Sequence, residues 1–328
     1  MLIGHRAQAA AFLDAWQSGR MPHAWLLAGA PGLGKRRFAD AAVAHVLADA
    51  AGPRVAADEL DISTDHPTAR LIAAGSHVDM RIITREVRER TGDLAAGITI
   101  DQIRGLQPLL HSTPALSAWR AIIIDSIDDL ARPAANALLK SLEEPPPTTL
   151  FMLVSHSPGR LLPTIRSRCR LMRFQSLADA DVDRVIAAQA PDLGVAERQA
   201  LLSVAQGAPG RALRYAGLDI GGLMEAIDAI EYRGNAIAIT ALSRTLSAKA
   251  AQQRYEAFLE IAPARIRQRA MAMQGTMLAE AIVLWEKARD LASSAVPLSL
   301  DPQSVIFELA GMLASLGRQT DRETSKHG

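Results

Sequence analysis

One stretch predicts the fold: Gly29-Ala30-Pro31-Gly32-Leu33-Gly34-Lys35-Arg36. It follows the phosphate-binding pattern of a glycine, four residues and Gly-Lys, but Arg36 stands where that pattern ends in serine or threonine. The glycines let backbone N–H groups curl around phosphates, and Lys35 can reach the outer phosphates. The missing hydroxyl is a Mg²⁺ ligand during phosphoryl transfer. The loop therefore predicts an ATPase fold and raises doubt that this chain hydrolyses ATP.

The residues around the loop predict a strand before it and a helix after it. Residues 24–28 are a short apolar run of the kind found in buried parallel strands, and residues 36–50 carry apolar side chains near helical spacing. Strand, glycine loop and helix form the context that makes a phosphate-loop match credible. Further strands and two more helices alternate along the chain, which predicts a parallel sheet covered on both faces. The strands are expected at 80–84, 121–125, 150–154 and 171–174, and helices at 133–142 and around 103–110.

Composition sets limits on the class of protein. Hydrophobic residues make up 49% of the 328 residues and aromatic residues 4%, which is typical of a helix-rich protein packed with alanine and leucine. The 36 basic and 35 acidic residues nearly cancel, so net charge gives no signal for nucleic acid. A single cysteine, Cys169, excludes an internal disulfide and a cysteine-rich zinc cage. No apolar run approaches the length of a membrane span, and we expect a soluble cytoplasmic protein.

The strand signal disappears after Phe174, which suggests separate domains. We expect an α/β domain at 1–174, a small helical domain at 175–216, a larger helical domain at 217–318 and a polar tail at 319–328. The fold class predicted from the sequence is thus α/β plus all-α.

A second candidate site feature follows the apolar run Ile122-Ile123-Ile124. Asp125 stands where a P-loop ATPase places the carboxylate that orients magnesium, but the next residue is Ser126. An active ATPase of the AAA+ type has glutamate there to polarise water, and a hydroxyl is a poor base near neutral pH. Asp128 and Asp129 lie nearby, and we expect them to cap the following helix or face solvent.

Four further blocks of sequence carry a family resemblance. The blocks are Asp101-Gln102-Ile103-Arg104, Ala73-Ala74-Gly75-Ser76-His77, Asn136-Ala137-Leu138-Leu139-Lys140-Ser141-Leu142-Glu143-Glu144-Pro145-Pro146 and Leu161-Leu162-Pro163-Thr164-Ile165-Arg166-Ser167-Arg168-Cys169. With them the chain resembles the clamp-loader branch of the AAA+ family over most of residues 1–215, and within it the delta-prime subunits of bacterial DNA polymerase III holoenzymes. The C-terminal region matches only in its helical character. The resemblance implies that residues 175–216 form a lid domain and residues 217–318 a collar domain for oligomerisation.

The resemblance implies a subunit of a five-member ring that opens a sliding clamp and sets it on primer-template DNA. Gamma/tau and delta subunits would be its partners, and it would belong to a DNA-directed DNA polymerase (nucleotidyltransferase) complex without independent catalysis. Arg168 resembles the arginine finger that reaches a neighbour's ATP in trans, and a guanidinium suits phosphate because it is permanently charged and has two donors. The alternative is a surface arginine held by local acids.

The resemblance also implies a vestigial nucleotide site. Arg211 in Gly207-Ala208-Pro209-Gly210-Arg211 resembles the second-sensor position, and Ser155 stands at the first-sensor position; a surface arginine and a strand-end cap are the alternatives. Backbone amides at a helix N-terminus attract phosphate without a metal, yet Arg36 adds bulk where magnesium would sit. We expect no required cofactor and weak or absent binding of ATP or ADP. The residues of this site are Gly29, Gly32, Gly34, Lys35, Arg36, Asp125 and Arg211.

A zinc module is expected to be missing. Relatives of this type carry clustered cysteines before the Ala-Gly-Ser-His block, where this chain has Ser63, His66 and Ala69. The possible ligands His66, His77, Asp58 and Asp65 have no spacing that supports a tetrahedral site. We predict no zinc and no other metal.

Two other functions compete with this interpretation. An autonomous ATPase of the gamma/tau type would need the hydroxyl after Lys35 and the glutamate after Asp125, and both are absent. A nuclease or polymerase would need a set of metal-binding acidic residues, which the sequence does not show.

Overall fold

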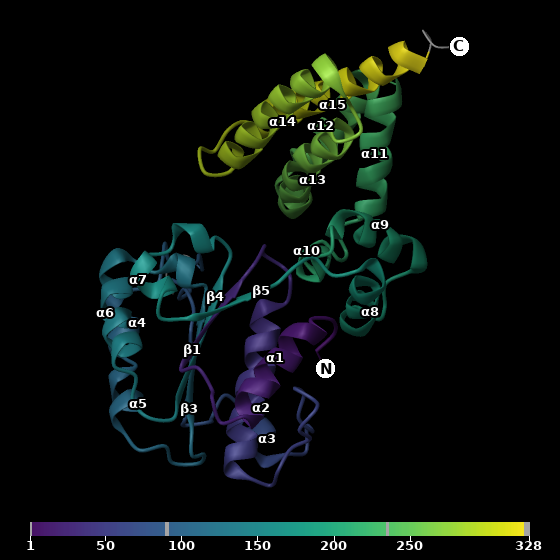
Figure 1. Cartoon of the computed structure of the whole chain (residues 1–328). Helices are drawn as coiled ribbons and strands as arrows, with labels where there is room; N and C mark the ends of the chain where they lie inside the picture. The colour runs from purple at the N-terminus through teal and green to yellow at the C-terminus, as the bar shows by residue number, and fades with distance from the viewer. Residues whose placement is uncertain (1, 89–91, 234–235, 325–328) are drawn as a thin grey trace. The chain divides into compact units, whose positions relative to one another are not determined.

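A computed structural model describes residues 2–88, 92–233 and 236–324 of the chain. It divides into two compact units (Figure 1). The first consists of residues 1–185 with residues 207–210, and the second of residues 186–206 with residues 211–328. The two units are described in turn.

The first unit is built on a five-stranded parallel sheet with strand order β2-β3-β4-β1-β5. All five strands that the sequence predicts are present, with ends that differ by one residue or less. Parallel strands need crossover connections, and helices supply these along the chain. The strands are β1 (Ala24–Ala28), β2 (Met80–Ile83), β3 (Arg120–Asp125), β4 (Thr149–Ser155) and β5 (Arg170–Arg173).

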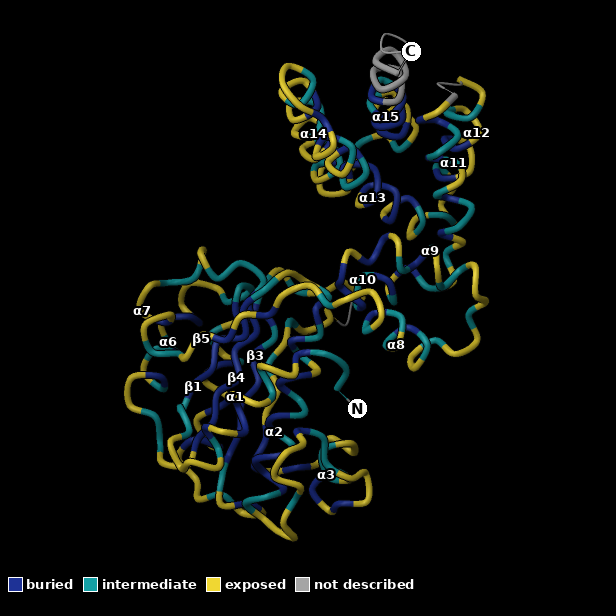
Figure 2. Tube along the Cα trace, turned by 45° about the vertical axis from the view of Figure 1, so that its right-hand side comes forward, coloured by how far each residue is buried: buried dark blue, intermediate teal, exposed yellow. Residues whose placement is uncertain are grey.

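Helices cover both faces of the sheet; its three central strands, β3, β4 and β1, are buried, and the edge strands β2 and β5 are partly exposed (Figure 2). Alternate side chains of a strand point to opposite faces, so Trp25 and Leu27 of β1 join one core while Leu26 joins the other. The first core packs α1 (Arg6–Gln17) and α2 (Lys35–Ala51). The second packs α4 (Ile100–Arg104), α5 (Gln107–His111), α6 (Arg132–Glu143) and α7 (Pro163–Arg166). The short elements α3 (Pro67–Ala73), η1 (Ile127–Asp129) and η2 (Pro158–Arg160) complete the unit.

The helix expected around 103–110 is two short helices, α4 and α5. Thr99 begins α4 with a capping box, in which its side chain and that of Gln102 each accept from the other's backbone N–H. Gly105 ends this helix, and Pro108 lies in the first turn of the next, where proline is tolerated. The chain therefore turns between the two.

The second unit is entirely helical over its described residues. Helix α15 packs against α11, α12, α13 and α14, and α11 also packs against α9. Buried aliphatic side chains such as Ile227, Ile266 and Leu313 lie on three of these helices. Helices α8 (Asp179–Gln189) and α10 (Pro209–Arg214) cross the boundary between the units. The others are α9 (Val195–Ala205), α11 (Ile220–Arg233), α12 (Ala236–Leu246), η3 (Lys249–Ala251), α13 (Gln252–Ala270), α14 (Gly275–Ala295) and α15 (Pro302–Thr324).

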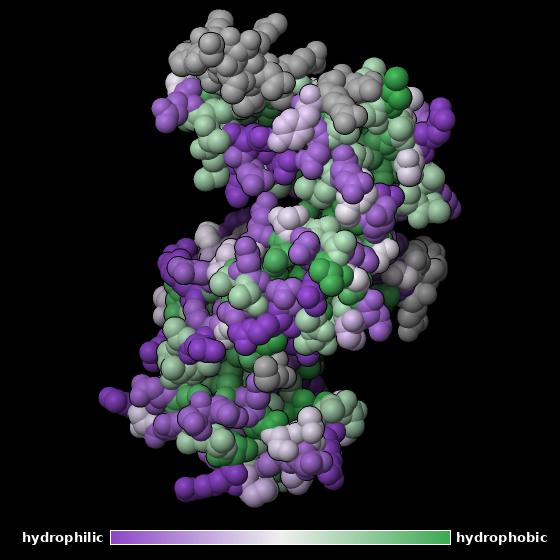
Figure 3. All heavy atoms as spheres, turned by 90° about the vertical axis from the view of Figure 1, so that its right-hand side faces the viewer, coloured by the Kyte–Doolittle hydropathy of each residue, from purple (hydrophilic) through white to green (hydrophobic). Residues whose placement is uncertain are grey.

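The predicted fold class, an α/β domain followed by helices alone, is confirmed. The expected boundaries at 174, 216 and 318 stay a prediction. On the face drawn in Figure 3, hydrophilic side chains are interspersed with hydrophobic ones. Within the described parts of the chain, no helix combines the length and apolarity needed to cross a bilayer.

One buried carboxylate ties the loop before β3 to the sheet. Asp79 is 3% exposed and accepts three backbone N–H bonds, from Ala115 at 2.7 Å, Leu116 at 2.7 Å and Ser117 at 2.9 Å. Its own carbonyl accepts from Ala121 of β3. Asp79 thus fixes the entry to a central strand through both its side chain and its backbone.

We predict that Asp79→Ala lowers the free energy of unfolding by about 2–4 kcal/mol, because three buried amides lose a charged acceptor. Urea denaturation followed by circular dichroism measures this. Asp101→Ala is the control, since its side chain is 86% exposed and pairs with the exposed Arg104; its effect should stay within about 0.5 kcal/mol. Equal effects of the two variants would contradict the role given to Asp79.

Candidate functional site

The phosphate-binding loop lies at the carboxyl edge of the sheet, between β1 and α2. Gly32 and Gly34 have positive φ angles of 78° and 84°, which favour glycine. Gly29 packs against β5, since a Cβ added there would lie 2.5 Å from the Phe174 carbonyl oxygen. Helix α2 begins at Lys35 and runs for 17 residues. The predicted strand, loop and helix are therefore assembled as a P-loop.

Lys35 is turned into its own loop. Its Nζ donates to the carbonyl oxygens of Gly29 at 2.7 Å and Ala30 at 2.6 Å, and the residue is 3% exposed. Burial lowers the pKa of Lys35 to about 8, against the opposing attraction of Asp125 and Asp128. The lysine is thus a buried cation, and its ammonium group uses loop carbonyls as acceptors.

Arg36 is paired with two carboxylates. Its Nε lies 2.9 Å from Asp40 Oδ1, one helical turn further along α2, and its Nη1 lies 3.5 Å from Asp125 Oδ2. A guanidinium is charged at all accessible pH values. Asp125, the residue expected to orient magnesium, therefore has a protein cation beside it.

Asp128 connects the ends of β3 and β4. It accepts hydrogen bonds from the hydroxyls of Ser126 at 2.7 Å and Ser155 at 2.9 Å, and from the backbone N–H groups of His156 and Ser157. These donors hold the pKa of Asp128 below its usual value although burial alone would raise it. The network engages both Ser126, which replaces the catalytic glutamate, and Ser155.

The expectation that Asp128 and Asp129 cap a helix or face solvent was wrong. Both are half-buried, and α6 begins at Arg132 after Ala131, without a side-chain cap. Asp129 pairs with Arg85 at 3.4 Å instead. The physical reason is the three-residue η1, which turns Asp128 back toward β4. The bond from Ser155 supports its interpretation as a strand-end cap.

Two residues that the sequence analysis did not select support the loop from outside. His5 Nε2 lies 2.7 Å from the Leu33 carbonyl oxygen, and its ring packs edge-on against Phe174. Burial lowers the pKa of His5, so the neutral ring donates through Nε2. Gly210 N donates to the Gly32 oxygen at 2.9 Å, and a Cβ at Gly210 would lie 2.9 Å from the Gly32 Cα. The Gly-Ala-Pro-Gly motif could have indicated Gly210, whereas no sequence pattern indicates His5.

Arg168 lies at the opposite edge of the sheet from the P-loop. It precedes β5, whose Arg170 is in register with Trp25 of the parallel strand β1. At about 3.3 Å per residue, the register places Arg168 and the P-loop about 20 Å apart along the strands. Arg168 and the P-loop of the same chain therefore form two separate sites.

Arg168 is held by two neighbours. Its Nη2 lies 2.8 Å from Glu143 Oε1 of α6, and its Nη1 donates to the Thr164 carbonyl at 2.9 Å, while 34% of the side chain stays exposed. The fold thus joins two of the sequence blocks that carry the family resemblance. An ion pair with one local acid fits both a surface arginine and an arginine pre-positioned for an external phosphate. Beside it, burial raises the pKa of the Cys169 thiol to about 12, so this thiol stays protonated.

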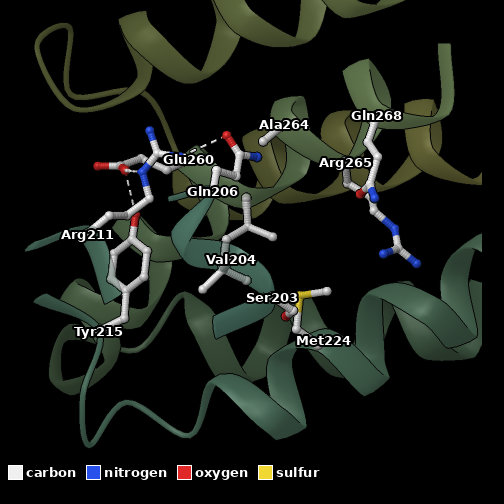
Figure 4. A pocket seen from close by; sticks show the side chains of 11 residues that line it. Ser203, Val204, Gln206, Arg211, Tyr215, Met224, Glu260, Ala264, Arg265 and Gln268 are labelled. Atoms are coloured by element: carbon white, nitrogen blue, oxygen red, sulfur yellow. Dashed lines mark hydrogen bonds and ion pairs between the residues drawn. The ribbon is translucent and has the colours of Figure 1, made fainter. Parts of the chain in front are cut away.

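Arg211 belongs to the second unit, and its surroundings are shown in Figure 4. Its Nη1 donates to Gln206 Oε1 at 3.0 Å, and its Nε lies 3.8 Å from Glu260 of α13. Glu260 also accepts from Arg214 and from the hydroxyl of Tyr215. Burial and the Glu260 carboxylate raise the pKa of Tyr215. Arg211 is therefore restrained by a carboxylate of its own unit.

The side chains considered for zinc have other roles. His66 Nδ1 caps α3 by accepting from Thr68 N, and its Nε2 bonds the Pro53 carbonyl. His77 is buried, and its ring nitrogens have no hydrogen-bond partner. Across residues 2–88, 92–233 and 236–324, no three His, Cys, Asp or Glu side chains gather as a metal site would require. The absence of zinc stays a prediction.

Three features define the class as a P-loop protein of the AAA+ type. They are the parallel sheet, the P-loop after β1 and the carboxylate at the end of β3. Residues 4–178 match the family model described as DNA polymerase III, delta subunit. More than half of the 328 residues are matched, and the chain belongs to this family.

Individual relatives agree with the family. The chain is 34% identical over 195 residues to DNA polymerase III subunit delta' of Pseudomonas aeruginosa, covering 60% of this chain and 56% of that protein. It is 32% identical over 157 residues to subunit delta' of Escherichia coli, covering 48% and 43%. A gamma subunit-related protein of Thermotoga maritima has a solved structure at 13% identity and a TM-score of 0.49, covering 93% of this chain and 99% of that chain. The delta-prime resemblance is confirmed, while the chain spans about half the length of these curated delta' relatives.

We predict that the burial of Lys35 makes the free energy of unfolding depend on pH. The pKa of Lys35 is about 8 in the folded chain, against an ordinary value of 10.5. The unfolded state therefore binds more protons between these pH values, and stability rises with pH across that window. Lys35→Met removes this dependence. The free energy of unfolding of Lys35→Met minus that of the unmodified chain should therefore fall by roughly 2–3 kcal/mol between pH 7 and 10.5.

Urea denaturation at a series of pH values measures this difference. Lys140→Met, on an exposed lysine of α6, is the matched control, and its difference from the unmodified chain should stay the same at each pH. A flat difference for Lys35→Met as well would show that this ammonium is not desolvated.

Proposed function

We propose that this chain is a clamp-loader subunit of a DNA polymerase III holoenzyme that does not hydrolyse ATP itself. It supplies Arg168 to the ATP site of a neighbouring subunit. The observation that carries the proposal is the pairing of Arg36 with Asp125, which replaces a metal ion by a fixed side chain. Family membership supports the clamp-loader part.

Three features support the loss of hydrolysis in cis. Arg36 stands in place of the hydroxyl that would bind Mg²⁺, and it neutralises the carboxylate that would orient the metal. Ser126 stands in place of the catalytic glutamate and donates to Asp128. A guanidinium cannot bridge two phosphate groups through an inner coordination sphere as Mg²⁺ does. Binding of ATP or ADP at Gly29, Gly32, Gly34 and Lys35 is accordingly weak or absent, and no cofactor is required.

The position of Arg168 supports a role in trans. It lies about 20 Å from the P-loop of its own chain by strand register, so an own-chain nucleotide is out of reach. An arginine side chain spans only about 7 Å. Its guanidinium is partly exposed and held by Glu143, and a phosphate would be a stronger partner than this half-exposed carboxylate. Gamma/tau and delta subunits in a five-member ring, the sliding clamp and primer-template DNA are the proposed partners, in the cytoplasm.

We predict that Arg168→Ala reduces ATP hydrolysis at the neighbouring site of a reconstituted loader by about 10³ or more, since trans arginines contribute 10³–10⁵. Arg168→Lys keeps the charge but loses bidentate contact with phosphate, so this variant should retain little of the ATPase activity. Clamp-dependent ATPase activity after co-purification with gamma/tau and delta subunits is the measurement.

The control is Arg70→Ala, which changes an exposed arginine paired with the exposed Asp65. It should leave loader ATPase unchanged. Assembly of the Arg168→Ala loader is checked by gel filtration, so that loss of a subunit is not mistaken for loss of the finger. Full ATPase activity in an assembled Arg168→Ala loader would overturn the trans role.

An autonomous ATPase of the gamma/tau type is the alternative. It would turn over ATP as an isolated chain, and Lys35→Ala would abolish that turnover. We predict no phosphate release above background from the isolated chain in a malachite-green assay with Mg²⁺. Turnover that depends on Lys35 would establish the alternative instead.

A further inference from the structure

A groove lies on the outer face of the sheet beside its last strand. It has a volume of about 490 Å³, and its lining includes Leu26, Leu171, Pro163, Arg166, Ser167 and Arg173. Leu26 and Leu171 are in register on neighbouring strands, so their side chains share a face and form an aliphatic floor. We call this feature the β5 groove. It adjoins Arg168 in sequence but does not include it.

The rim of the β5 groove is strongly basic. Residues 157–174 contain five arginines and no acidic residue. Arg168 pairs with Glu143, and Arg170 lies over the ring of Trp25 at 4.9 Å. The remaining three are exposed and have no ion-pair partner in the described part of the chain; they are Arg160, Arg166 and Arg173. Such a cluster of uncompensated guanidinium groups favours an anionic partner.

The groove also adjoins an open strand edge. In the sheet order of the described residues, β5 has β1 on one side and no strand on the other. Phe174 N donates to Ala28 O of β1, and the direction of backbone groups alternates along a strand, so Leu171 and Arg173 turn theirs outward. The Arg173 carbonyl accepts from the Gln8 side chain at 2.8 Å, so a docked segment has to share or replace this one bond.

These observations distinguish between two anionic partners. Nucleic acid without base pairing is usually held by aromatic side chains that stack on bases, and the lining of this groove has no aromatic residue. An extended peptide instead uses an open strand edge for backbone hydrogen bonds and alternate side chains for pockets. We propose that the β5 groove docks an extended acidic segment of a partner protein. An aliphatic side chain of the segment lies over Leu26 and Leu171, and carboxylates two residues away on either side meet Arg166 and Arg173.

This docking site goes beyond the proposed arginine finger and does not depend on it. A direct test measures fluorescence anisotropy of a labelled peptide, Ser-Glu-Ser-Leu-Ser-Glu-Ser, with the full chain. Its spacing of two places both glutamates and the leucine on one face of an extended strand. Arg166→Gln and Arg173→Gln should each weaken its affinity about tenfold. Arg104→Gln, on an exposed arginine of α4, and Arg168→Ala should leave it unchanged.

A charge exchange makes the test specific. The Arg173→Glu variant should no longer bind the acidic peptide and should instead bind a version of it in which lysine replaces glutamate. A labelled oligothymidylate is the competing probe. No peptide binding, or peptide binding unaffected by both glutamine variants, would overturn the proposal. Oligothymidylate binding that depends on Arg166 and Arg173 without peptide binding would assign the groove to nucleic acid. Thermal unfolding of each variant confirms that it is folded.

Discussion

The parallel pairing of β1 with both β4 and β5 determines where each candidate residue lies. Because β1 runs in the same direction as its neighbours, the P-loop after it shares an edge with the end of β4, where Ser155 and Asp128 meet. The same pairing places the residues before β5 at the other edge. The register of β1 with β5 thus places the P-loop and Arg168 at opposite edges of the sheet. The role in trans proposed for Arg168 rests on this separation.

At the P-loop edge, side chains of the protein satisfy groups that a nucleotide and its metal would otherwise engage. Lys35 donates to loop carbonyls, Arg36 pairs with Asp125, and Asp128 collects the donors at the strand ends. On the proposed function, a nucleotide would have to displace the lysine contacts, and a metal would meet Arg36 beside Asp125. The proposed loss of hydrolysis therefore rests on several linked contacts and not on the missing hydroxyl alone.

Around β5, arginines remain uncompensated. The segment from Ser157 to Phe174 includes one arginine tied to Glu143 and three without ion pairs in the described residues. Leaving like charges close together costs stability unless an anion arrives. We place the neighbour's phosphate at Arg168, before β5, and an acidic segment in the β5 groove.

The sequence by itself determined the five strands, the P-loop with its substituted Arg36, the Asp125-Ser126 pair and the family. These are local signals: a buried parallel strand is a continuous apolar run, and a glycine loop is read within eight residues. Only the tertiary structure decided which groups meet. It paired Arg36 with Asp125, turned Asp128 toward Ser155, brought His5 and Gly210 onto the loop, and joined Arg168 to Glu143. Partners separated by 25 to 178 positions become neighbours only through strand register and helix packing, which no local pattern encodes.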